Sequence, residues 1–96
     1  MKKPKTDRRR EKRKPARAKV SFILQREGSL EIEGQLIDVS QRGFRAAHQD
    51  RTLSAGEEVG FREPQRQGRA RVMWCRILPE RVESGFLILE SSTVHL

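Results

Sequence analysis

Hydrophobic and polar residues alternate along most of the chain from Lys19 onward, with the period of two that is typical of β-strands. Six short segments show this pattern, and turn residues such as Gly, Ser and Pro separate them. Their alternating positions are Val20, Phe22 and Leu24; Leu30, Ile32 and Leu36; Phe44, Ala46 and His48; Val59 and Phe61; Ala70, Val72 and Trp74; and Phe86 and Ile88. Since no segment has a helical period, the pattern predicts an all-β protein, either a six-stranded antiparallel barrel or a sandwich. Residues 90–96 leave room for at most a very short C-terminal helix.

The first two strands are joined by a turn that we expect to be centred near Gly28. In an antiparallel hairpin with that centre, Ala18 faces Asp38 and Arg17 faces Val39. The segment before the first strand should therefore run beside the end of the second strand. An error of one or two residues in the turn would not change this conclusion.

Charge divides the chain into two parts. Residues 1–19 contain eleven Lys and Arg and only two acidic residues, whereas residues 20–96 contain ten Arg and eleven acidic residues. Residues 1–18 have no hydrophobic periodicity and a dense positive charge, so we expect a flexible basic arm followed by a barrel domain at 19–96. Such an arm attracts an anionic partner, which can be a nucleic acid, a membrane surface or a phosphorylated small molecule.

Several classes of protein are disfavoured by the sequence. No apolar run approaches the ~18 residues of a membrane span, and no apolar region of a secretory signal follows the basic N-terminus. The single Cys75 cannot form an internal disulfide, which fits the reducing cytoplasm. His48 and His95 have no second metal ligand at a useful spacing, so we expect no metal. Ser40 has no nearby His, and Cys75 has no partner residue, so we expect no enzyme.

The segment at the end of the second predicted strand carries the residues with the clearest binding chemistry. Asp38 can accept hydrogen bonds from the N–H edge of a guanine. Ser40 offers a short hydroxyl for a turn or a phosphate, and Gly43 permits positive φ or a close approach of the backbone to a ligand. The arginines of the arm can bind phosphates through their planar fork and can stack on a purine. The hairpin brings these groups to one rim of the predicted barrel.

An Arg-x-x-x-Arg pair before the first strand, followed about twenty residues later by Asp-x-Ser-x-x-Gly, resembles the signature of the PilZ domain family. Later segments also resemble the family, namely 53–57, 71–74 and 85–90, so the resemblance covers residues 8 to 90. It implies a PilZ-type β-barrel whose ligand is cyclic di-GMP, bound without a metal. It also implies that both arginines grip the guanines and phosphates, while Asp38, Ser40 and Gly43 complete the site on the barrel.

Two arginine pairs have the required spacing. Arg13 and Arg17 lie nearer to the first strand and are favoured, whereas Arg9 and Arg13 lie further out. The resemblance adds Trp74 as a candidate ligand contact, because PilZ barrels can place an aromatic residue of this strand near the bound guanine. A core position is the commoner role for a Trp that alternates with buried residues.

The sequence therefore predicts a bacterial, cytoplasmic receptor that binds cyclic di-GMP. We expect ligand binding to change the conformation of the arm and the signal to pass to an unidentified protein partner, without membrane insertion or specific nucleic-acid binding. The alternative is a small nucleic-acid-binding β-barrel with a basic arm. That class needs exposed aromatic residues and a basic barrel surface, whereas this chain has no Tyr, four Phe and one Trp. A PilZ relative that has lost its ligand and serves only as an interaction module is disfavoured by the motif residues.

Overall fold

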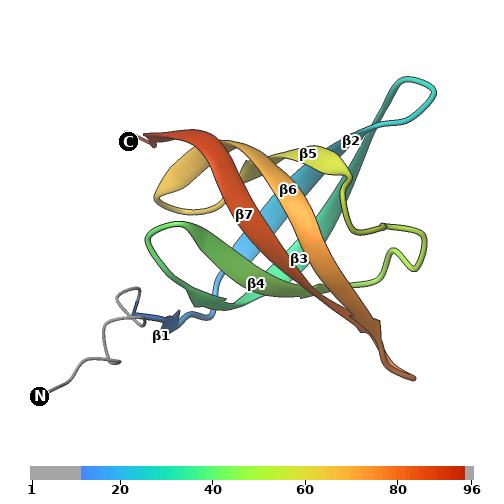
Figure 1. The fold of residues 1–96 in the computed structure, drawn as a ribbon, viewed down its shortest axis with the longest axis horizontal. Helices are drawn as coiled ribbons and strands as arrows, with labels where there is room; N and C mark the ends of the chain where they lie inside the picture. The colour runs from blue at the N-terminus through green and yellow to red at the C-terminus, as the bar shows by residue number, and fades with distance from the viewer. Residues whose placement is uncertain (1–11, 95–96) are drawn as a thin grey trace, which may run out of the picture.

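The computed structural model describes residues 12–94, which form seven β-strands and no helix. The strands are β1 (Lys14–Pro15), β2 (Lys19–Gln25), β3 (Ser29–Val39), β4 (Gly43–His48), β5 (Glu58–Arg62), β6 (Arg66–Ile77) and β7 (Val82–Thr93). They pair antiparallel in the order β1-β3-β2-β5-β6-β7-β4, and an additional pairing of β3 with β4 closes the sheet (Figure 1). The predicted all-β, six-stranded antiparallel barrel is confirmed, with β1 as an extra strand. Residues 90–93 continue β7 instead of forming a short helix.

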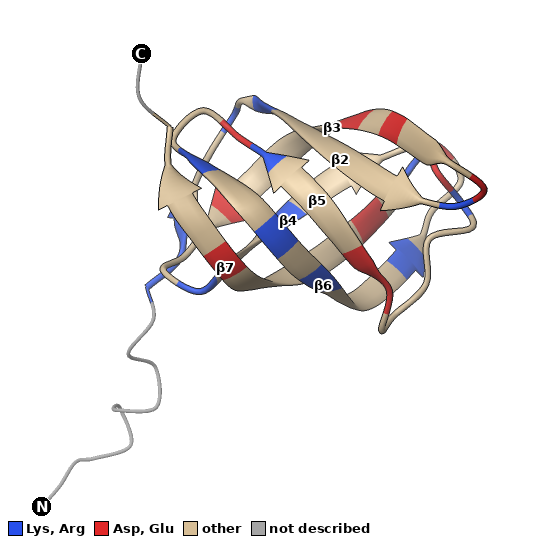
Figure 2. Cartoon of the chain, turned by 90° about the horizontal axis from the view of Figure 1, so that it is seen from above, with Lys and Arg blue, Asp and Glu red and all other residues tan. Residues whose placement is uncertain are grey.

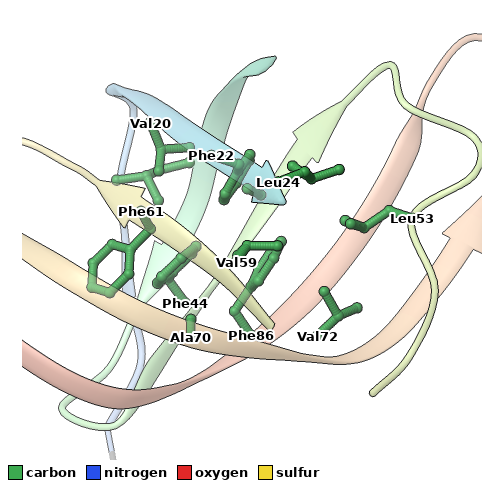
Figure 3. Close-up of a cluster of buried hydrophobic side chains, with 12 residues drawn as sticks. Val20, Phe22, Leu24, Phe44, Leu53, Val59, Phe61, Ala70, Val72 and Phe86 are labelled. Carbon is green, nitrogen blue, oxygen red and sulfur yellow. The ribbon is translucent and has the colours of Figure 1, made fainter. Parts of the chain in front are cut away.

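Alternate residues of the strands point into the barrel and fill it. Phe86 stacks on both Phe22 and Phe44, with ring centroids 4.8 Å apart in each pair, and Phe61 lies tilted against Phe44 at 5.2 Å. Figure 3 shows these rings together with the aliphatic side chains that surround them, including Val20, Leu24, Leu53, Val59, Ala70 and Val72. Because inward and outward positions alternate on each strand of a small barrel, the period-two pattern of the sequence marks most of the core, but Leu30 and Trp74 of that pattern are exposed.

The first hairpin turns earlier than the sequence analysis expected. Both Glu27 and Gly28 have positive φ, 48° and 102°, and the turn is centred on Glu27. The predicted pairing of Ala18 with Asp38 is therefore wrong, and the carbonyl of Ala18 accepts a hydrogen bond from the backbone of Leu36 (2.8 Å). The shift of two residues moves a more N-terminal part of the chain beside the end of β3.

That part of the chain is β1, which lies within the region predicted to be a flexible arm. Lys14 pairs with Val39 and Pro15 pairs with Asp38, both on β3. Figure 1 shows β1 at this position. Arg13 directly precedes β1 and is consequently placed next to the end of β3. The division of the chain into an arm at 1–18 and a barrel at 19–96 stays a prediction, because most of the arm lies outside the described residues. Within residues 12–94, no helix is long and apolar enough to cross a membrane.

Candidate ligand-binding site

The turn between β3 and β4 carries the Asp-x-Ser-x-x-Gly motif. The backbone N–H of Ser40 donates to the carbonyl of Gly43 (2.9 Å), and the Ser40 hydroxyl donates to the same oxygen (3.4 Å). A Cβ atom at Gly43 would lie 2.2 Å from the carbonyl oxygen of Phe86 on β7. The turn therefore needs glycine because β4 and β7 approach each other closely here, and positive φ is not the reason.

An ion pair at the connection between β5 and β6 supports this turn. Nη1 of Arg66, at the start of β6, donates to the carbonyls of Ser40 (3.1 Å) and Gln41 (3.2 Å). Nε of Arg66 donates to the buried carboxylate of Glu63 (2.7 Å). Because a guanidinium is planar and rigid, these bonds hold the turn in one position relative to β6.

Asp38 lies at the centre of a cluster of charges and is only 6% exposed. Its carboxylate accepts from Nε of Arg13 (3.1 Å) and from Nε of Arg45 (2.9 and 3.1 Å), and also from Nη2 of Arg45. Nη1 of Arg13 donates to the hydroxyl of Ser40 (3.2 Å). Burial opposes ionisation of Asp38, but the hydrogen bonds from Arg45 and Arg13 outweigh burial and lower its pKa. Asp38 is thus ionised at neutral pH and holds two guanidinium groups.

An open cavity of about 390 Å³ adjoins this cluster, within the size range of small-molecule sites. Its lining includes the three arginines Arg13, Arg42 and Arg45 as well as Met73 and Trp74. The cavity therefore combines several guanidinium groups with a flat indole, which suits a ligand that carries both phosphates and aromatic bases.

Trp74 does not lie in the core, although its alternation with Ala70 and Val72 suggested a core position. The pairing of β6 with β7 is irregular between Val72 and Trp74, so Met73 and Trp74 are both exposed, by 50% and 39%. A Cβ at Gly85 would lie 2.3 Å from Nε1 of Trp74, so the indole packs directly on the Gly85 backbone. The bulge thus places Trp74 beside the cavity instead of in the core.

The structure brings together five of the predicted site residues, which are Arg13, Asp38, Ser40, Gly43 and Trp74. Arg17 is exposed and does not line this cavity. Arg9 and His95 lie outside the described residues. The choice between the pairs Arg13/Arg17 and Arg9/Arg13 stays a prediction, and Arg13 belongs to both.

The site also contains residues that the sequence did not predict, namely Arg42, Arg45 and Met73 in the lining and Arg66 behind the turn. Arg45 could have been found, because it alternates with the buried residues Phe44 and Ala46 and must face outward beside the motif. Arg66 carries no such signal, since only the closure of the barrel brings it to the turn. Within residues 12–94, no group of three or more His, Cys, Asp or Glu side chains could hold a metal ion.

Comparison with known families agrees with this geometry. A family model described as PilZ domain matches residues 7–94, a range that includes all seven strands and the cavity. No curated protein matches the chain. Since the family model covers nearly the whole sequence, the chain belongs to the PilZ family of cyclic di-GMP-binding domains.

Proposed function

We propose that this protein is a cyclic di-GMP receptor whose arginine-rich arm closes over the ligand and whose new surface is read by a partner protein. The observation that carries the proposal is the position of Arg13. Its guanidinium is held by Asp38 and Ser40 at the edge of the cavity that Trp74 borders. Arg13 of the basic arm, the charged groups around Asp38 and the exposed indole of Trp74 are then contiguous.

The chemistry of the ligand matches these groups. Cyclic di-GMP carries two phosphates and two guanines, and arginine binds phosphate through paired, charge-assisted hydrogen bonds. The indole of Trp74 offers a face for a guanine, and Arg9 and Arg17 are proposed to add contacts from the arm. PilZ domains are ligand-binding domains and are generally not enzymes. We propose that this protein acts in the bacterial cytoplasm, where its free Cys75 stays reduced.

Selectivity for guanine can come from two sources at this site. Asp38 can accept from the N–H edge of guanine, and an arginine can donate to its O6 and N7 atoms. Both Asp38 oxygens already accept from Arg13 and Arg45, so a guanine at Asp38 would share the carboxylate with them or displace one. Adenine presents an amino group where guanine presents O6, which disfavours adenine at the arginine, and adenine lacks the N1–H and the 2-amino group of guanine, which disfavours adenine at Asp38.

The test is isothermal titration calorimetry of the purified protein with cyclic di-GMP, cyclic di-AMP, GTP and GMP. Cyclic di-GMP should bind far more tightly than the other three nucleotides. Equal affinity for cyclic di-AMP would rule out guanine recognition by Asp38 and the arginines.

The nucleic-acid alternative is tested by the same protein with DNA and RNA. Figure 2 shows acidic and basic residues interspersed over the strands of the barrel, which is unlike a continuous basic surface. We expect salt-dependent binding without sequence preference, which cyclic di-GMP competes away. Sequence-selective binding that cyclic di-GMP leaves untouched would favour the alternative.

A further inference from the structure

We infer that Arg45 is a third ligand-binding arginine of this site and that Asp38 is its positioning residue. Arg45 lies two residues beyond the Asp-x-Ser-x-x-Gly motif, and the Arg-x-x-x-Arg pair does not include it. The inference rests on the proposed function and adds a residue to it. Two observations support it. Asp38 orients the guanidinium of Arg45 through hydrogen bonds, and Arg45 lines the cavity.

Asp38 and Arg45 face each other on neighbouring strands. They are direct partners in the pairing of β3 with β4, next to an irregularity that follows Leu36. The Asp38 carboxylate is buried, while the Arg45 side chain is 43% exposed. Asp38 is therefore the buried partner of the ion pair, and Arg45 is the partner that a ligand in the cavity can reach.

The bonds to Asp38 use only one edge of the Arg45 guanidinium. Nε and Nη2 donate to Asp38 and form the side fork of the group. A guanidinium has five N–H donors, and the two on Nη1 lie away from that edge. Arg45 also lines the cavity together with Arg13 and Trp74. Its outer donors are thus pre-oriented for an acceptor of the ligand, either a phosphate oxygen or O6 and N7 of guanine.

Arg13 is bound by the same carboxylate and provides the comparison for Arg45. Nε of Arg13 donates to Oδ1 of Asp38, and the Arg13 side chain is 38% exposed. Asp38 therefore holds one arginine from β4 and one from the segment before β1, on two sides of a single anion. A clamp of this kind loses less conformational entropy on binding than two free arginine side chains would lose.

The experiment measures cyclic di-GMP affinity by calorimetry for Arg45→Ala, Arg45→Lys and the control Arg69→Ala. Arg69 lies on the outer face of β6, pairs with Glu58 and Glu90, and is similarly exposed, but it does not line the cavity. Arg45→Ala should weaken binding about ten- to hundredfold. Arg45→Lys should fall between Arg45→Ala and the parent, because a lysine keeps the charge but not the fork. Arg69→Ala should change affinity less than about threefold, because it removes only a surface ion pair away from the cavity.

The positioning role of Asp38 is tested by a double-mutant cycle with Asp38→Asn. If Asp38 acts through Arg45, Arg45→Ala should cost clearly less affinity in the Asp38→Asn background than in the parent. Strictly additive losses would overturn the positioning role. Thermal unfolding followed by circular dichroism identifies any variant that has lost its fold, and Arg45→Lys remains informative if Asp38→Asn does not fold.

The two proposals fail in different ways. If the parent protein does not bind cyclic di-GMP, the proposed function is wrong. If the parent binds and Arg45→Ala binds as tightly as Arg69→Ala, only the assignment of Arg45 is wrong, and its contact with Asp38 is then a structural ion pair between two strands.

Discussion

Among single residues, Arg13 has the most specific environment for ligand binding, because it contacts both Asp38 and Ser40 at the cavity. A lost charged hydrogen bond costs about 1.5–3 kcal/mol, so Arg13→Ala should weaken cyclic di-GMP binding about ten- to hundredfold in calorimetry. If Arg13 acts together with Arg17, Arg17→Ala should weaken binding as much as Arg13→Ala does. If Arg13 acts together with Arg9, Arg9→Ala should have that effect instead. Circular dichroism should show an intact barrel in all three variants. If all three variants bind cyclic di-GMP as tightly as the parent protein, the arm does not take part in ligand binding.

His48 is a buried residue whose protonation should affect stability. The backbone N–H of Asp50 donates to its Nδ1 (3.2 Å), so the neutral ring carries its proton on Nε2 and donates to the hydroxyl of Ser84 (2.8 Å). Burial lowers the pKa of His48 below its ordinary value of 6.5, and the nearby charge of Asp50 opposes this only partly. The folded protein therefore binds fewer protons than the unfolded chain just below pH 6.5.

It follows that the contribution of His48 to stability is fully present above pH 6.5 and decreases as the pH falls below that value. Urea unfolding at pH 7.5, 6.5 and 5.5 measures the decrease. In His48→Gln the difference in unfolding free energy between pH 7.5 and 5.5 should shrink, whatever the absolute stability of the variant. An unchanged difference would mean that His48 is not the titrating group. The acidic residues with lowered pKa, such as Asp38, act at lower pH and do not interfere.

At the scale of elements, the contact between β4 and β7 determines whether the motif turn can form. A Cβ at Gly43 would overlap the carbonyl oxygen of Phe86, which is a backbone atom and cannot rotate away. Gly43→Ala should therefore destabilise the barrel by about 1–3 kcal/mol, as overpacking does, and should also weaken ligand binding by moving Ser40.

Gly60 provides the matched control for this substitution. It also lies in a strand, β5, but a Cβ there would meet its nearest atom at 3.5 Å, an ordinary contact. Chemical unfolding of Gly60→Ala should give a stability close to that of the parent. If Gly43→Ala were equally stable, β4 and β7 would not be as closely packed as the structure indicates.

For the whole molecule, the proposed response is the closure of the basic arm over the ligand. The arm contains many Lys and Arg residues, so trypsin cleaves there wherever the chain is accessible. Cyclic di-GMP should slow cleavage within residues 1–18 severalfold, because ordering of the arm accompanies neutralisation of its arginines. Mass spectrometry of the digests locates the protected sites. Cleavage at the same rate with bound ligand, at a saturation verified by calorimetry, would contradict arm closure.

The sequence by itself determined the fold class, most of the core and the motif. Alternating residues such as Phe22 and Phe86 could be assigned to the interior because strand geometry sends every second side chain to the same face. The Asp38–Gly43 motif could be identified because its spacing is local and needs no knowledge of other strands. The expectation that the segment before the first strand runs beside the end of the second strand also agrees with the structure, although the predicted register does not, because Pro15 instead of Ala18 lies opposite Asp38.

Only the tertiary structure decided the register and the surroundings of the motif. The earlier turn at Glu27 depends on the conformation of single residues, which composition does not reveal. The bulge before Trp74 interrupts the alternation of β6 and moves the indole from the predicted inner face to the cavity. Arg45 and Arg66 reach the motif through strand pairing and barrel closure. Such contacts join residues that are distant in the sequence, so they follow from how the sheet closes and not from any local pattern.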